Sequence, residues 1–259
     1  MKGKCALITG STAGLGAAVA ARLAAEGCHI VLNGFGDAAG IEAQRRALEK
    51  EHGVGVLYHG ADLAVPSQIA DLMRDATHRF GGVDILVNNA VVRHFAPIQA
   101  FPVEAWDRAI AVNVSAAFHT IRLALPGMLA RNWGRIINMS SVYGLFATVN
   151  RVDYVTSKTA LIGMTRAVAL ECAGHDITCN AVNPGTVLTP AIEERLEAMM
   201  AAEGLTREAA VSRYLAVRQP SGRFVSEHNV AALVAFLCSD AGRDITGATL
   251  PMDGGWSAS

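Results

Sequence analysis

Short apolar stretches alternate along the chain with longer segments in which apolar residues recur at helical spacing. The apolar stretches predict strands near residues 4–9, 28–33, 55–59, 83–87, 134–140, 177–182 and 247–251. The segments between them predict helices near residues 14–27, 37–52, 66–80, 103–130, 152–174 and 227–239. This alternation is typical of repeated βαβ units, whose strands form a parallel sheet.

A longer insertion separates the sixth and seventh predicted strands. It covers about residues 186–226 and contains two amphipathic stretches, 191–203 and 206–217. Open α/β sheets bind ligands at the carboxyl ends of their strands, so the insertion is expected to be a helical substrate lid. A purely structural helical pair is the alternative. Because no linker or change in composition divides residues 1–259, we expect one α/β domain with a doubly wound, seven-stranded parallel sheet.

Composition and charge exclude several classes of protein. Although 51% of the residues are hydrophobic, no uncharged apolar run approaches the roughly 20 residues that cross a bilayer. The net charge is −1, with 22 basic and 23 acidic residues intermixed, which argues against binding to nucleic acid or an anionic membrane. The five dispersed cysteines favour reduced thiols in the cytoplasm. The eight histidines form no zinc-binding spacing, so no metal is expected.

A glycine-rich loop directly follows the first predicted strand and precedes a helix rich in alanine. Glycine permits a tight turn and lets backbone amides approach a pyrophosphate, which also meets the positive end of the helix dipole. The loop therefore predicts a dinucleotide site. Its expected cofactor contacts are Gly10, Ser11, Thr12, Gly14, Leu15 and Gly16.

Segments after later strands extend this predicted site. The segment after the second strand contains Asn33 and Phe35 but no cation to pair with a 2′-phosphate, so NAD is favoured over NADP. Asn33 stands where an acidic ribose partner is usual, and its amide can still hydrogen-bond a hydroxyl. The other expected cofactor contacts are Asp62, Leu63, Asn89, Ala90, Pro184, Gly185, Val187 and Thr189. For Asp62, an ordinary loop carboxylate is the alternative.

Tyr154 and Lys158 are four residues apart on a predicted helix, and Ser141 precedes them. Residues at this spacing share a helix face, so the Lys158 ammonium is expected beside the Tyr154 phenol. A free phenol has a pKa of about 10, and a neighbouring cation lowers it by stabilising the phenolate. The pair is thus a candidate acid/base near neutral pH. A solvated helix face is the alternative, which the glycine loop, Asn113 and Ser141 at consistent separations disfavour.

Together these motifs resemble the short-chain dehydrogenase/reductase family over nearly the whole chain, including the terminal Asp253-Gly254-Gly255. The resemblance implies a Rossmann fold, a homotetramer, NAD, and a catalytic tetrad of Asn113, Ser141, Tyr154 and Lys158. In this interpretation Tyr154 takes the proton of a secondary alcohol as hydride leaves, and Ser141 hydrogen-bonds the same oxygen. Lys158 holds the phenolate and the cofactor ribose. Asn113 carries a water that relays the proton outward, or else is a structural amide.

Segments 31–37, 60–63 and 253–256 look like bacterial D-3-hydroxybutyrate dehydrogenases. In those enzymes glutamine, histidine and lysine side chains hold the substrate carboxylate. Val91 replaces a family glycine here, and Thr186 replaces a tryptophan. Converging arginines suit a carboxylate, phosphate or sulfonate, although surface roles remain the alternative. The residues that match the family's carboxylate-binding positions are Arg93, Tyr143, Arg151 and Arg195.

Three functions remain open. The first is an NAD-dependent oxidoreductase that interconverts a small 3-hydroxybutyrate-like hydroxy acid and its keto acid. The second is a dehydrogenase of a more polar or dianionic hydroxy acid, such as a sugar acid, a phosphonate or a sulfonate. The third is a non-catalytic dinucleotide-binding regulator, against which the intact tetrad argues. In each case the expected partners exclude nucleic acid and membranes.

Overall fold

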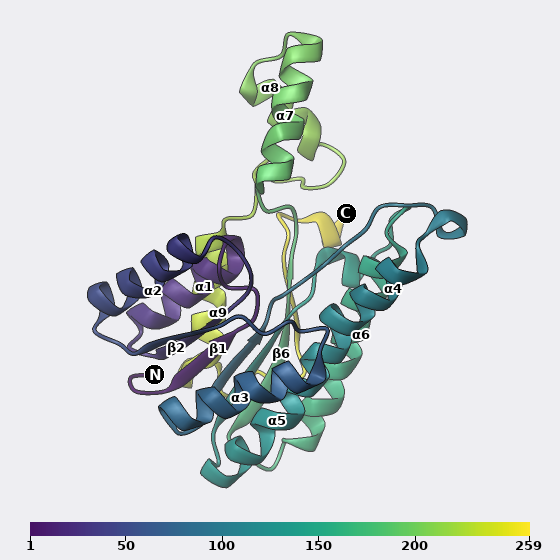
Figure 1. The fold of residues 1–259 in the computed structure, drawn as a ribbon. Coiled ribbons are helices and arrows are strands. Elements are labelled where there is room, and N and C mark those ends of the chain that lie inside the picture. The colour runs from purple at the N-terminus through teal and green to yellow at the C-terminus, as the bar shows by residue number, and fades with distance from the viewer.

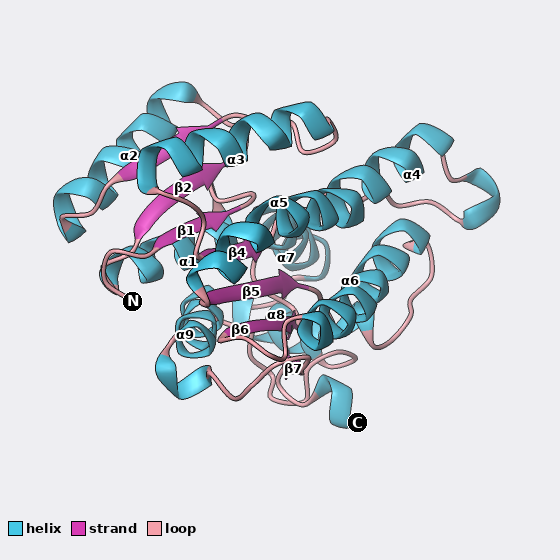
Figure 2. Cartoon of the chain, turned by 90° about the horizontal axis from the view of Figure 1, so that it is seen from below, coloured by secondary structure: helices cyan, strands magenta, loops and turns pink.

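The computed structural model describes residues 1–259 and contains one parallel sheet of seven strands with helices on both faces (Figures 1 and 2). The strand order is β3-β2-β1-β4-β5-β6-β7, so the fold class expected from the sequence is confirmed. Each of the seven strands overlaps a predicted one. Their bounds are β1 (Cys5–Ile8), β2 (His29–Asn33), β3 (Val56–His59), β4 (Ile85–Asn88), β5 (Gly134–Met139), β6 (Ile177–Pro184) and β7 (Thr249–Met252).

Two helical layers bury the two faces of the sheet. One layer contains α1 (Gly14–Ala25), α2 (Ala38–His52) and α9 (Glu227–Cys238), and the other contains α3 (Pro66–Phe80), α5 (Ala116–Arg131) and α6 (Val152–Glu171). Successive residues of a strand point to opposite faces. In β2, Ile30 and Leu32 accordingly join the core under α1, whereas Val31 joins the core under α3 and α5. Burial on both faces explains why the strands are continuously apolar in sequence.

The predicted helix over residues 103–130 is interrupted in the structure. It comprises α4 (Val103–Ile110), a π-helical segment (Ala111–Ser115) and α5. In the π-helical segment the Ala116 amide donates to the Ala111 carbonyl. Such segments are frequent at functional sites. By length and composition, Val103–Arg131 is the one helical stretch apolar enough to cross a membrane, but 44% of its apolar window is buried within the fold.

The insertion after β6 forms two helices, α7 (Pro190–Glu203) and α8 (Arg207–Leu215), that project from the carboxyl edge of the sheet (Figure 1). Both predicted amphipathic stretches are therefore helical. Their apolar side chains Leu196, Ala210 and Leu215 are fully buried. A bridge between Val187 and Val225 closes the base of the insertion. The helical pair is thus connected to the body through a narrow stem.

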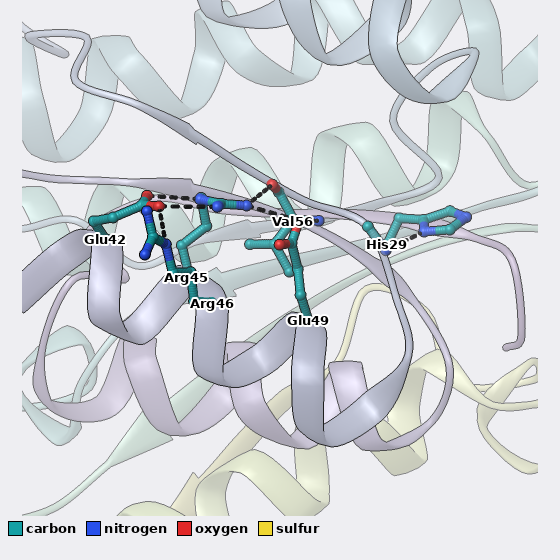
Figure 3. A network of polar contacts seen from close by, with 7 residues as sticks. His29, Glu42, Arg45, Arg46, Glu49 and Val56 are labelled. Atoms are coloured by element: carbon teal, nitrogen blue, oxygen red, sulfur yellow. Dashed lines mark hydrogen bonds and ion pairs between the residues drawn. The ribbon is translucent and has the colours of Figure 1, made fainter.

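A polar network fastens α2 to the edge of the sheet (Figure 3). Arg45 pairs with Glu42 and Glu49, at 2.7 Å in each case, and also donates to the Val56 carbonyl. Hydrogen bonds from Arg45 and Arg46 lower the pKa of Glu42 to about 2. Because solvent screens these partly exposed groups, the pairs stabilise the fold little. The network therefore orients α2 more than it stabilises the fold.

A chain of buried side-chain hydrogen bonds joins α5 to α6 across two central strands. Thr120 donates to Asn88 (2.7 Å), and the Asn88 amide donates to Asn138 (2.9 Å). Asn138 then donates to Thr165 (2.9 Å) on α6. All four residues are buried, so each broken link leaves a polar group without water. This chain holds α6 in register with the strand ends.

We expect Asn138→Leu to lower the free energy of unfolding by about 2 kcal/mol or more, because an unsatisfied buried donor costs about 1–3 kcal/mol. Urea titration followed by circular dichroism measures this change. Asn229→Leu on the exposed start of α9 is the control, expected to change stability by less than about 0.5 kcal/mol. Equal effects of the two substitutions would show that the buried chain contributes nothing specific.

Candidate active site

A cavity of about 690 Å³ opens along the carboxyl edge of the sheet and continues under the insertion. Its floor includes Gly10, which follows β1, and Asn89, which follows β4. The neighbouring strands β1 and β4 lie where the strand order reverses, the usual ligand-binding position in an open α/β sheet. The cavity therefore lies where the sequence placed the dinucleotide site.

The glycine loop depends on a backbone contact that excludes side chains. A Cβ on Gly16 would lie 2.2 Å from the Gly10 carbonyl oxygen, and one on Gly10 would lie 2.9 Å from the Ala90 Cα. The φ of Gly10 is also positive, at +64°. Asn89 ties the loop to β4 by donating to the carbonyls of Thr9 (2.9 Å) and Gly10 (3.0 Å). These contacts fix the loop against the end of β4.

Helix α1 begins at Gly14, and no side chain caps its first turn. The first backbone N–H groups of an uncapped helix have no partner within the helix and carry partial positive charge. Here they face a cavity lined by Thr12, Gly14 and Leu15. This end of the cavity can accept an anionic group such as a pyrophosphate.

The end of the cavity beside β2 and β3, where the adenosine of a dinucleotide is expected, contains a cation that the sequence did not reveal. We call it the adenosine end. Asn33 is buried and donates to the carbonyls of His59 (3.0 Å) and Ala61 (3.1 Å), so most of its amide holds the end of β3. Its Oδ1 is buried without a partner. Asp62 pairs with Arg108 at 3.4 Å, and both line the cavity. Arg108 is thus a cation at this end, already engaged by a carboxylate.

Of the predicted cofactor contacts, only Ser11 does not line the cavity. Its hydroxyl donates to the Ile8 carbonyl (2.8 Å) and accepts from the backbone N–H of Asn33 (3.1 Å). These bonds point the Ser11 side chain into the protein interior. Ser11 therefore supports the loop from behind. The predicted contacts that do line the cavity are Gly10, Thr12, Gly14, Leu15, Gly16, Asn33, Phe35, Asp62, Leu63, Asn89, Ala90, Pro184, Gly185, Val187 and Thr189.

Ser141, Tyr154 and Lys158 line the same cavity. The Lys158 Nζ lies 5.5 Å from the centroid of the Tyr154 ring and donates to the Met139 carbonyl at 2.6 Å. Lys158 is only 3% exposed, and this burial lowers its pKa to about 7, with repulsion from Arg93 adding to the effect. The amine that faces the Tyr154 ring therefore titrates near neutral pH.

Hydrogen bonds between side chains and backbone hold the end of β5 against α6 and β6. The Ser141 hydroxyl accepts from the Tyr143 amide (3.2 Å), and the Ser141 carbonyl accepts from the Asn183 side chain (2.7 Å). Ser140 donates to the Lys158 carbonyl at 2.7 Å. Ser141 and Lys158 are thus positioned by one network rather than by separate loops.

Asn113 does not line the cavity and lies in the π-helical segment. Its Oδ1 accepts from the Val92 amide (2.9 Å), and its Nδ2 donates to the Val92 carbonyl (2.8 Å) and to the Ser157 hydroxyl (3.2 Å). The amide therefore holds the loop after β4. A water relay through Asn113 remains a prediction, and the side-chain amide is already engaged by Val92 and Ser157.

The other end of the cavity is lined by the predicted substrate residues Arg93, Tyr143, Arg151 and Arg195. Arg151 lies over the Phe95 ring, with its guanidinium carbon 4.1 Å from the centroid. Tyr143 meets the Tyr154 and Trp256 rings edge-on. Sequence analysis assigned no role to four residues that line this end: Phe95, Tyr214, Arg218 and Trp256.

Comparison with known proteins adds a chemical context to this geometry. A family model described as enoyl-(acyl carrier protein) reductase matches residues 10–257. The chain is 47% identical over 258 residues to a D-beta-hydroxybutyrate dehydrogenase of Cupriavidus necator, covering 100% of this chain and 99% of that one. It is 45% identical to a D-beta-hydroxybutyrate dehydrogenase of Rhizobium meliloti, with 98% of this chain and 99% of that one covered.

Two similar solved structures hold different cofactors. The L-sorbose reductase of Gluconobacter frateurii, complexed with NADPH and L-sorbose, is 31% identical with a TM-score of 0.93, covering 100% of this chain and 98% of that one. An NAD⁺-bound xylitol dehydrogenase is 30% identical with a TM-score of 0.86, covering 98% and 99%. The shared fold thus serves both cofactors, and local residues decide between them.

We expect the burial of Lys158 to give stability a pH dependence that Lys158→Met removes. The folded-state pKa of Lys158 is about 7, whereas the unfolded value is 10.5, so between these values the unfolded chain binds the extra proton. The free energy of unfolding should then rise with pH in this window, by up to about 1.4 kcal/mol per pH unit. Below pH 7 both states bind the proton and the dependence disappears.

Urea unfolding of both proteins from about pH 6 to about pH 9.5 tests this linkage. The difference in unfolding free energy, parent minus variant, should grow more positive as the pH rises. A difference that stays constant across the window would show that the folded-state pKa of Lys158 is not lowered.

Proposed function

The chain belongs to the short-chain dehydrogenase/reductase family, and we propose that it is an NAD-dependent oxidoreductase that interconverts a small, 3-hydroxybutyrate-like hydroxy acid and its keto acid. One observation supports the proposal most directly. Ser141, Tyr154 and Lys158 line the cavity that the glycine loop also lines, so a proton-transfer group lies within reach of a bound dinucleotide. A regulator that only bound the dinucleotide would have no need for these three side chains together.

In this proposal Tyr154 takes the proton from the substrate hydroxyl, and Ser141 donates a hydrogen bond to the same oxygen. NAD, when bound, supplies the acceptor for the hydride. Lys158, held by the Met139 carbonyl beside the Tyr154 ring, stabilises the phenolate with its charge and contacts the cofactor ribose. Its lowered pKa means that its protonation state changes near neutral pH.

The residues at the cofactor end fit a dinucleotide. The absence of side chains at Gly10 and Gly16 leaves backbone at the surface of the cavity, next to the uncapped start of α1. The buried, unpartnered Oδ1 of Asn33 can accept a hydrogen bond from a ribose hydroxyl. Asp37, which caps α2 through the Gly40 amide, adds negative charge to the segment after β2, on the side where a 2′-phosphate would be expected.

Several further assignments belong to the same proposal. Residues 186–226 serve as the substrate lid of a single domain. The protein assembles as a homotetramer, which is supported by an apolar groove on α5 and α6 that contains the half-exposed Phe118. It works in the cytoplasm, consistent with five cysteines that are all unpaired and buried.

We expect Tyr154→Phe to lower kcat by about two to four orders of magnitude, the scale on which an acid/base group contributes. Affinity for NAD, measured by calorimetry, should stay nearly unchanged. Tyr143→Phe is the matched comparison, because its ring lies 6.3 Å from that of Tyr154, centroid to centroid. Activity above about a tenth of the parent in Tyr154→Phe would assign the proton transfer to another group.

NAD should be preferred over NADP by about tenfold or more in kcat/KM, because no unpaired cation faces the 2′ position and Asp37 repels a phosphate. Steady-state kinetics with each cofactor, over the same series of substrate concentrations, measures the ratio of the two kcat/KM values. Equal efficiencies, or a preference for NADP, would make Arg108 rather than Asp37 the dominant charge at the adenosine end.

Arg151→Met should raise the Michaelis constant for an acidic substrate at least about tenfold, because Arg151 is half-buried and its loss should cost more than that of an exposed pair, about 1 kcal/mol, and less than that of a buried one, about 3–5 kcal/mol. Methionine keeps an apolar stem over Phe95, and NAD affinity should hardly change. The control is Arg243→Met at an exposed position outside the cavity. A neutral alcohol of similar shape that is oxidised as well as the acid by the parent enzyme would contradict the assignment.

A further inference from the structure

The substrate end of the cavity has an excess of positive charge. Arg93 and Arg151 line it from the body of the protein, and Arg195 and Arg218 line it from the insertion. The only carboxylates that line the cavity are Asp62 and Glu227. Asp62 is paired with Arg108, and Glu227 lies beside Gly14 at the start of α1. No acidic side chain in the cavity therefore balances the four arginines.

Most hydrogen-bond donors of these four arginines also have no partner within the protein. None of the four forms a salt bridge, and Arg218 alone makes a hydrogen bond, to the Tyr214 carbonyl at 2.8 Å. By contrast, arginines elsewhere, such as Arg131 and Arg135, pair with Asp84 and Asp176. Arginine presents a planar fork of donors to an oxyanion, and at this site the forks remain available.

Arg151 is held in place without being neutralised. Its guanidinium carbon lies 4.1 Å from the Phe95 centroid, 5.4 Å from that of Tyr154 and 5.7 Å from that of Tyr143. Contacts with ring faces orient a cation but leave its net charge in place. Burial lowers the pKa of Arg151, and repulsion from the nearby Arg93 lowers it further. A half-buried cation therefore lies near a second, exposed one of the same charge.

Arg93 is fixed by its neighbours on both sides. Asn113 binds both the amide and the carbonyl of Val92, at 2.9 and 2.8 Å. The buried Asp153 accepts from the His94 amide at 2.8 Å, which ties the loop to the first turn of α6. The backbone around Arg93 is thus pinned to the same helix that carries Arg151 and Tyr154. The backbone position of Arg93 is therefore defined, whereas its exposed side chain makes no hydrogen bond or ion pair within the protein.

A single carboxylate carries one negative charge, so it would leave Arg93 and Arg151 together with a net positive charge. A tetrahedral dianion offers three acceptor oxygens and two charges, which matches the charge of two neighbouring guanidinium groups. The proximity of Arg151 to the Tyr154 ring also requires the anion to lie a short chain away from the reacting carbon. We propose, on the basis of the proposed function, that the substrate is a short secondary alcohol bearing a doubly ionised phosphonate group.

The reaction itself balances as an alcohol oxidation. The hydroxyl proton passes to Tyr154 and the hydride to NAD⁺, which leaves a carbonyl at the former carbinol carbon. The carbon–phosphorus bond and the charge of the phosphonate are unchanged. The phosphonate anchors the substrate through Arg93 and Arg151. Arg195 and Arg218 contact the phosphonate from the insertion.

Three alcohols of the same carbon skeleton test the proposal: 3-hydroxybutanoate, 2-hydroxypropanesulfonate and 2-hydroxypropylphosphonate. They differ only in the acid group, so kcat/KM for NAD reduction separates charge from tetrahedral shape. We expect the phosphonate to exceed the carboxylate at least about tenfold, a difference of about 1.4 kcal/mol, and to exceed the singly charged sulfonate as well. Equal values for carboxylate and phosphonate, or for sulfonate and phosphonate, overturn the dianion assignment.

Arg93→Gln provides the matched variant. It should lower kcat/KM for the phosphonate at least about tenfold and that for the carboxylate less than about threefold, because one remaining arginine suffices for one charge. Arg243→Gln is the control. If Arg93→Gln affects both substrates alike, Arg93 does not recognise the second charge and the inference is wrong.

Binding of unreactive analogues separates this inference from the proposed function. Propylphosphonate and butanoate lack the hydroxyl group, and their affinities for the NAD-loaded protein can be measured by calorimetry. Tighter binding of propylphosphonate, lost in Arg93→Gln, supports the dianion site even if none of the three alcohols is oxidised, in which case only the proposed reaction fails. Equal affinities overturn the inference even if 3-hydroxybutanoate is turned over rapidly.

Discussion

The close approach of the glycine loop to the end of β4 is the constraint on which the site depends. No side chain fits between Gly16 and the Gly10 carbonyl, where a Cβ would lie at 2.2 Å. Asn89 closes the contact from the other side through the carbonyls of Thr9 and Gly10. The contact brings β4 beside the start of α1, so residues after β4 enter the cavity next to the dinucleotide site. Arg93 is placed by this geometry, four residues beyond Asn89.

The second constraint is the cost of burying cations at the strand ends. Lys158 is almost fully buried, and only the Met139 carbonyl accepts a hydrogen bond from it. Burial lowers the pKa of Lys158 and of Arg151, and repulsion from Arg93 adds to both shifts. A bound anion relieves this repulsion at every one of these groups. In the proposed function, the charge of the substrate and the protonation of Lys158 are therefore coupled, because both act through one low-dielectric region.

Sequence reasoning predicts structure well where residues close together in the chain determine it. The seven strands follow from apolar runs buried on both faces, and the glycine loop and the Tyr154/Lys158 pair follow from fixed short spacings. It fails where partners are distant. Ser11 turns inward because the Asn33 amide binds its hydroxyl, and Arg108 reaches Asp62 across 46 positions of the chain. The π-helical turn and the engaged amide of Asn113 likewise depend on packing that periodicity does not encode.

Chemistry and specificity occupy different parts of this fold. Ser141 and Lys158 are fixed by bonds among β5, β6 and α6, including the Asn183 contact to the Ser141 carbonyl, so their geometry is as rigid as the sheet. Arg195 and Arg218 lie instead on the insertion, which joins the body through a narrow stem. The backbone of Arg93 is held less firmly than the strand ends and more firmly than the insertion, because its loop is hydrogen-bonded at Val92 and His94. Under the proposed function, changes in the loop and the insertion would therefore alter which anion is held without moving the proposed proton-transfer group.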